Sequence, residues 1–198
     1  MPVSSSINSS TLLTEAEQTE LRALAFQVIS NGAQQHKLIL PSQPKSKALQ
    51  QATANFVTVY VDDELRGCLG CYIGEQPLWK SVCHHAYSSA FEDYRFTPLQ
   101  AKELAVLRIE ISILSELMEL ENNGQQALLA SLVPEVDGLL IKEQTAYGAK
   151  RSALFLPSVW RSLPTAEMFV QTLKQKGGWP SDYWSEYIEL FRFHTQVF

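Results

Sequence analysis

Little charge, few cysteines and no long hydrophobic run characterise this sequence. Only 19% of its 198 residues are charged, with 16 Lys and Arg against 21 Asp and Glu. The resulting net charge of -5 argues against a nonspecific nucleic-acid binder, because such proteins present net positive charge. Three cysteines cannot all pair with one another, which argues against a disulfide-stapled secreted fold. A hydrophobic content of 45% excludes intrinsic disorder and suffices for a buried core.

No targeting or membrane segment is visible. Residues 1–13 are rich in Ser, and no Lys or Arg precedes an apolar stretch there, as it would in a signal peptide. The apolar clusters elsewhere are much shorter than the roughly 20 residues of a membrane-spanning helix. We therefore expect a cytoplasmic protein in which residues 1–13 form a flexible lead and residues 14–198 a single domain.

A helix is predicted to follow the lead. Thr14 and Glu17 fit a capping box, in which the two side chains satisfy the first free backbone amides. Apolar residues then recur at the spacing of one helical face: Leu21, Leu24, Ala25, Val28 and Ile29. Gly32 is expected to end this helix in the left-handed conformation.

A β-hairpin is predicted next. Residues Phe56–Val61 are rich in β-branched and aromatic types, Asp62–Glu64 supply turn chemistry, and Leu65–Ile73 return. Gly67 and Gly70 interrupt the returning strand, so we expect a bulge or a close approach of another backbone there.

The remaining pattern mixes helices with short strands. A second helix is predicted from Pro77 and should stop before Pro98. Val106–Leu114 alternates between apolar and polar residues, which indicates one buried face and favours an antiparallel sheet. Further elements are predicted as short strands and one helix: strands at Gly138–Glu143, Ala153–Leu156 and Tyr187–Phe193, and a helix between Pro164 and Gly177. This mixture indicates an α+β fold.

The segment Leu65–Gly70 reads Leu-Arg-Gly-Cys-Leu-Gly, and it resembles the signature of the AMMECR-type domain family. Bacterial members of this family are called AmmeMemoRadiSam system protein A. The resemblance continues through further segments in order: Phe56–Thr58, Asp93–Pro98, Ile109–Leu114, Leu156–Val159 and Lys176–Gly178. It covers essentially the whole chain after the lead.

This resemblance implies an antiparallel β-sheet flanked by helices, with a second, smaller α+β subdomain. It also implies two partners, a Memo-like protein and a radical S-adenosylmethionine enzyme. It supplies no established reaction, so enzyme activity stays open, and we expect no cofactor. Cys71 departs from the usual family pattern, and no role for it follows from the resemblance.

Cys68 is the candidate nucleophile. On a regular strand Arg66 and Cys68 share a face, and a guanidinium beside a thiol favours the reactive thiolate. His84, or its neighbour His85, could serve as the base, because their predicted helix follows the strand directly. The alternative interpretation is that Cys68 is simply a small buried residue, which is common for free cysteine.

Four further residues are candidates for ligand binding. Gly67 and Gly70 would leave room above the backbone for a ligand or partner. Asp93 and Arg95 lie at the exit of the second helix, where Arg95 could line a cleft for an anionic ligand. We favour a structural interpretation of this pair, in which both side chains brace the turn while Phe96 fills the core.

A zinc site is a second possible chemistry. Cys68, Cys71, Cys83 and His84 would supply three sulfurs and one nitrogen, a tetrahedral set. Residues three apart on a regular strand face opposite sides, so both sulfurs reach one ion only if Gly70 turns the chain. Cys83 also lies on the apolar row of its helix. We therefore predict no metal site.

Two functions remain open. The first is an accessory or binding protein that works with the Memo-like protein and the radical enzyme. The alternative is an enzyme that uses Cys68 as a nucleophile on a small molecule or a protein. We favour the binding protein because no complete acid–base or metal constellation is visible. Nucleic-acid binding is not indicated, since basic and aromatic residues are not interleaved.

Overall fold

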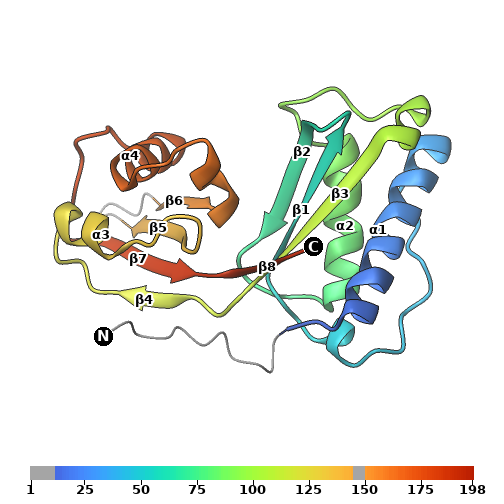
Figure 1. The fold of residues 1–198 in the computed structure, drawn as a ribbon, viewed down its shortest axis with the longest axis horizontal. Coiled ribbons are helices and arrows are strands. Elements are labelled where there is room, and N and C mark those ends of the chain that lie inside the picture. The colour runs from blue at the N-terminus through green and yellow to red at the C-terminus, as the bar shows by residue number, and fades with distance from the viewer. Residues whose placement is uncertain (1–11, 145–149) are drawn as a thin grey trace. The chain divides into compact units, whose positions relative to one another are not determined.

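The computed structural model describes residues 12–144 and 150–198, and Figure 1 shows its fold. The chain divides into two compact units. One comprises the chain up to Leu114 together with Gln196–Phe198, and the other comprises Ser115–Thr195. Most of the predicted lead lies outside the described residues, but Leu13 is buried and exchanges two hydrogen bonds with the Gln196 amide. The single domain over residues 14–198 stays a prediction.

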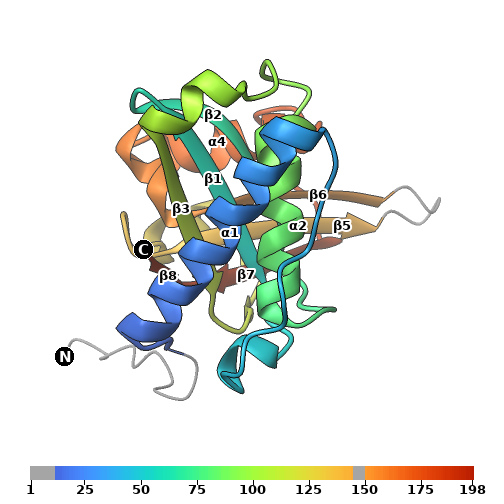
Figure 2. The ribbon, with the colours of Figure 1, turned by 90° about the vertical axis from the view of Figure 1, so that its right-hand side faces the viewer.

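The first unit is a four-stranded sheet with two helices on one face (Figure 2). The strands follow the order β2-β1-β3-β8, and β1 pairs antiparallel with both β2 and β3. The elements of this unit are α1 (Glu15–Gln35), β1 (Asn55–Val61), β2 (Glu64–Cys71), α2 (Leu78–Phe91), β3 (Leu107–Leu114) and β8 (Thr195–Val197), with 3₁₀ helices at Ala48–Gln50 and Ala101–Val106.

Helix α1 begins as predicted and ends later than predicted. The Thr14 hydroxyl accepts from the Glu17 amide, and the Glu17 carboxylate accepts from the Thr14 amide at 2.9 Å, which completes the capping box. The helix continues through Gly32, and His36 takes the left-handed conformation with φ of 55°. Gly32 is needed for packing instead, since a Cβ there would lie 2.5 Å from the Phe91 ring of α2.

The predicted hairpin is present, with a tight turn and a bulge. Asp62 and Asp63 both have positive φ, at 51° and 62°, as the two-residue turn between twisted strands requires. The pairing of β1 with β2 shifts register between Val59 and Tyr60, which leaves Arg66 as the extra residue. The expected irregularity in the returning strand is therefore a bulge centred on Arg66.

Successive side chains of β1 project from opposite faces of this sheet. Val57 and Val59 are fully buried and join Ile111 in the core that α1 and α2 cover. Thr58 lies between the two valines in sequence, so its side chain projects from the opposite face. Helix α2 ends at Phe91, several residues before the predicted limit at Pro98, because a hydrogen-bonded turn replaces its next helical turn.

The second unit is smaller and has its own sheet, in the order β4-β7-β5-β6. Its elements are β4 (Met118–Leu120), α3 (Gln125–Ser131), β5 (Gly138–Gln144), β6 (Lys150–Phe155), α4 (Ala166–Lys176) and β7 (Ile188–Phe193), with a 3₁₀ helix at Pro157–Arg161. Phe169 of α4 stacks on Trp160 with ring centroids 4.0 Å apart, and both side chains are buried. The predicted α+β class, with antiparallel sheets and flanking helices, is confirmed. Within the described part of the chain, no helix has the length and apolar character needed to cross a membrane.

Candidate functional site

The signature residues Leu65–Gly70 lie on β2, which is the outer strand of the first sheet. The outer backbone groups of such a strand have no neighbouring strand to pair with. Two side chains from the turn after α2 satisfy them at Cys68. The Cys68 amide donates to Asp93 Oδ2 at 3.0 Å, and Arg95 Nη2 donates to the Cys68 carbonyl at 3.0 Å. Asp93 and Arg95 together thus imitate a neighbouring strand, and we call this pair the edge clamp.

The edge clamp is held by its own ion pair. Arg95 donates from Nε to Asp93 Oδ1 at 2.8 Å and from Nη2 to Oδ2 at 2.6 Å, a bidentate geometry. These bonds from Arg95, with further help from the Cys68 amide, lower the pKa of Asp93 to about 2. The Asp93 side chain is almost fully buried, whereas that of Arg95 is 45% exposed. The bracing interpretation of this pair agrees with the geometry, although Phe96 is half-buried beside Arg95 and does not fill the core.

Arg66 is engaged away from the thiol. Its Nε donates to the Thr97 carbonyl at 2.7 Å, and its Nη2 lies 3.0 Å from a carboxylate oxygen of Glu103. Both partners come from the segment between α2 and β3, and the Arg66 and Glu103 side chains are mostly buried. Arg66 therefore ties the bulge of β2 to this segment.

The Cys68 thiol lies on the sheet face opposite the helices. The Thr58 hydroxyl donates to Cys68 Sγ at 3.3 Å, so Cys68 projects from the same face as Thr58. His84 and His85 belong to α2, which covers the other face. The sheet therefore lies between the thiol and both histidines, and the predicted Cys68–His84 pair is not assembled.

The room that we expected beside the two glycines is already filled. A Cβ on Gly67 would lie 1.9 Å from the Ser89 carbonyl oxygen of α2, so the helix backbone rests directly on the strand. A Cβ on Gly70 would lie 2.4 Å from the Phe56 ring. Gly67 thus serves helix–strand packing rather than ligand binding, which corrects that part of the sequence interpretation.

The three cysteines do not converge. Cys71 Sγ lies 4.0 Å from Ser81 Oγ of α2, so Cys71 faces the helices while Cys68 faces away from them. Cys83 is fully buried, and burial raises the pKa of its thiol to about 12. Among the described residues, no group of three or more His, Cys, Asp or Glu is placed to hold a metal ion. The zinc set considered from the sequence is therefore not assembled.

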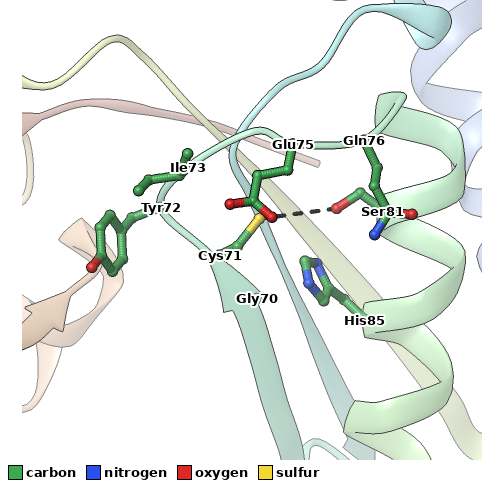
Figure 3. Close-up of a pocket in the computed structure, with 8 residues that line it drawn as sticks. All are labelled: Gly70, Cys71, Tyr72, Ile73, Glu75, Gln76, Ser81 and His85. Atoms are coloured by element: carbon green, nitrogen blue, oxygen red, sulfur yellow. Dashed lines mark hydrogen bonds between the residues drawn. The ribbon is translucent and has the colours of Figure 1, made fainter.

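A pocket of about 370 Å³ lies where β2 leaves the sheet and the chain turns into α2 (Figure 3). Eight residues line it: Gly70, Cys71, Tyr72, Ile73, Glu75, Gln76, Ser81 and His85. Of the residues predicted for the site, Gly70 lines this pocket, and so does His85, the alternative candidate base.

A buried amide organises one wall of this pocket. Asn55, at the start of β1, is completely buried and donates from Nδ2 to the Thr53 carbonyl and to Ser81 Oγ, at 3.0 and 2.9 Å. Its Oδ1 lies 2.8 Å from His85 Nδ1. Sequence reasoning missed Asn55 and Ser81. The available signal was a lone amide opening an otherwise apolar strand, since such a side chain needs partners when buried.

The comparisons with known proteins agree with this fold. The profile of the AMMECR1 family matches residues 22–198. Protein MJ0810 of Methanocaldococcus jannaschii is 31% identical over 193 residues, which cover 94% of this chain and 92% of that protein. A protein of Thermotoga maritima is 28% identical, with 87% of this chain and 92% of the relative covered.

A solved structure is also similar. The crystal structure of the uncharacterized protein PH0010 from Pyrococcus horikoshii superposes with a TM-score of 0.79 at 27% identity, and it covers 90% of this chain and 88% of that one. The family profile alone spans well over half of the sequence. The chain belongs to the AMMECR1 family.

Proposed function

We propose that this chain is a non-catalytic binding protein of the cytoplasm, which works with a Memo-like protein and a radical S-adenosylmethionine enzyme. The observation that carries the proposal is the set of contacts that the signature residues Leu65–Gly70 make. The backbone of Cys68 is held by the edge clamp, Arg66 is tied to Thr97 and Glu103, and Gly67 seats α2. These contacts support a role of the signature in building a rigid edge.

The alternative, an enzyme with Cys68 as nucleophile, is disfavoured because neither histidine predicted as its base lies on the same side of the sheet as the thiol. A cysteine nucleophile is activated by an adjacent base or by a lowered pKa. His84 and His85 lie across the sheet from the thiol, and the Arg66 guanidinium is turned to other partners. Arg95 interacts electrostatically with Cys68, but its charge is paired with the buried Asp93.

One exposed side chain indicates where a partner would bind. Tyr94 stands between the two residues of the edge clamp and is 95% exposed. The clamp fixes the turn on both sides of Tyr94, so little conformational entropy is lost when the ring is buried. Tyrosines in such positions are frequent binding hot spots. We place the partner-binding surface around Tyr94.

Binding measurements with the purified Memo-like and radical enzymes test the proposal. At micromolar concentration we expect one of them to bind, and Tyr94→Ser to weaken that binding by about tenfold, as loss of a hot-spot aromatic does. Tyr187→Ser removes a ring that is 55% exposed in the second unit and serves as the matched control. Lack of binding to both partners would overturn the proposal, as would equal effects of the two substitutions.

Thiol titration separates the alternative. The binding protein needs no reactive thiol, so we expect Cys68 not to be alkylated faster than an ordinary cysteine by a mild reagent. A strongly depressed pKa, together with selective alkylation of Cys68 by a mild reagent, would instead favour the enzyme. The variant Cys71→Ser simplifies the titration because the buried Cys83 does not ionise in this range.

A further inference from the structure

We propose that the pocket at the end of β2 binds a small organic cation, in which a protonated amine is attached to an apolar or aromatic group. This inference is independent of the proposed function, because the pocket and the surface around Tyr94 share no residue. The argument rests on which hydrogen-bonding groups the pocket can offer and on the sign of its charge.

The hydrogen-bond network fixes the tautomer of His85. Asn55 donates from Nδ2 to the Thr53 carbonyl, which can only accept, so the orientation of the amide is determined. Asn55 Oδ1 must then accept from His85, at 2.8 Å, and the ring proton therefore resides on Nδ1. The other ring nitrogen, Nε2, is left with a lone pair. His85 lines the pocket (Figure 3), so it presents a hydrogen-bond acceptor to a ligand.

The imidazole of His85 stays neutral under ordinary conditions. Burial, together with the neighbouring His84, lowers its pKa to about 4. A group with this pKa cannot take a proton from Cys71 to a useful extent, since an ordinary thiol ionises only above about pH 8. The arrangement of His85 and Cys71 therefore suits recognition of a ligand rather than activation of the thiol.

The charge of the lining selects the ligand. The eight lining residues include the carboxylate of Glu75 at the exposed rim and no Lys or Arg. An anionic ligand would find no opposite charge among them, whereas a cation finds a carboxylate and a neutral acceptor. Tyr72 and Ile73, which is 53% exposed, also line the pocket, and their side chains lie on the side away from Glu75 and His85 (Figure 3). An ammonium group can pair with the carboxylate and the acceptor, while an apolar body attached to it extends toward Tyr72 and Ile73.

Three compounds of matched shape but different charge test, on the intact chain, whether the pocket prefers a cation. Phenethylammonium, 2-phenylethanol and phenylacetate share one aromatic body and carry a positive, a neutral and a negative head. We expect phenethylammonium to bind in the millimolar range and the other two about tenfold more weakly. Binding is followed through the backbone amide shifts of Tyr72 and Ser81, and through the ¹⁵N shift of His85 Nε2, which should move as that nitrogen accepts a hydrogen bond.

Substitutions on the same strand–helix unit provide the control. Glu75→Gln keeps the shape of the rim and should weaken phenethylammonium binding by about fivefold, as loss of a partly exposed ion pair does. Glu64→Gln removes the same charge at the far end of β2 and should leave binding unchanged. The proposal is overturned if the three compounds bind alike, if none binds, or if the two substitutions have equal effects.

Discussion

Replacing Asp93 with Asn removes one charge from the edge clamp while leaving the volume of the side chain almost unchanged. In the folded protein this carboxylate accepts from the Cys68 amide and from three groups of Arg95. These bonds lower its pKa from an ordinary value of 3.8 to about 2. Since each pKa unit corresponds to about 1.4 kcal/mol, the ionised form contributes at most about 2 kcal/mol to folding. The exposure of Arg95 to solvent reduces this figure to about 1–2 kcal/mol.

The sign of the pH dependence follows from the lowered pKa. A carboxylate with a depressed folded-state pKa contributes its full stability above the unfolded value, here 3.8. That stability is lost as the pH falls from 3.8 through about 2, where the folded form also takes up a proton. We therefore expect Asp93→Asn to cost stability at pH 7, with the difference from the parent protein shrinking across this acid window.

Urea unfolding followed together with hydrogen exchange measures the effect. At pH 7 the urea midpoint of Asp93→Asn should be lower than that of the parent protein. Hydrogen exchange of the Cys68 amide should be faster in the variant, because the edge clamp protects this amide. As a control, Glu92→Gln removes the charge of the adjacent residue, which is exposed and accepts a hydrogen bond from Ser88 Oγ. If Asp93→Asn destabilises the protein no more than Glu92→Gln does, the edge clamp does not hold the strand.

Three further outcomes follow from the same geometry. Gly67→Ala should lower the free energy of unfolding by about 3 kcal/mol or prevent folding, because the added Cβ would collide with the Ser89 carbonyl. Denaturant unfolding curves measure this loss, and a loss below about 1 kcal/mol would contradict the packing. Cys83 should resist alkylation at pH 8 until denaturant is added, given its burial and a pKa of about 12, and mass spectrometry of native protein would reveal any early labelling. His85 should titrate near pH 4 in an NMR experiment and stay protonated on Nδ1 above that pH, and a midpoint near 6.5 would refute the network that includes Asn55.

The sequence predicts regular elements well where local pattern decides them. The capping box at Thr14 and the hairpin turn at Asp62 are encoded by neighbouring residues, and the structure agrees with both. The strand β3 forms where the alternation predicts it, but its second half is buried on both faces. The end of α1 differs from the prediction because a distant partner sets it, whereas α2 stops before Pro98 as predicted. Gly32 stays helical to admit the Phe91 ring, and α2 stops where Asp93 turns to the edge of β2.

The candidate site was harder to predict for the same reason. Spacing along a strand indicates which side chains share a face, but not what fills the space above them. The bulge at Arg66 and the engagement of its guanidinium by Thr97 and Glu103 depend on a segment some 30 positions later. Likewise, the wall of the pocket joins Asn55 of β1 to Ser81 and His85 of α2, a convergence that only the folded chain creates.

The position of β8 bears on how the molecule is synthesised. β3 receives its outer neighbour from Thr195–Val197, and the backbones of Ile111 and Phe198 exchange two hydrogen bonds. These residues leave the ribosome only after the whole of Ser115–Thr195 has been translated. Throughout that interval the first sheet displays an open edge at β3, which is a template for pairing with another nascent chain. The first sheet therefore lacks its last strand until translation is nearly finished. The time for which the β3 edge can aggregate depends on how quickly the inserted second unit is translated.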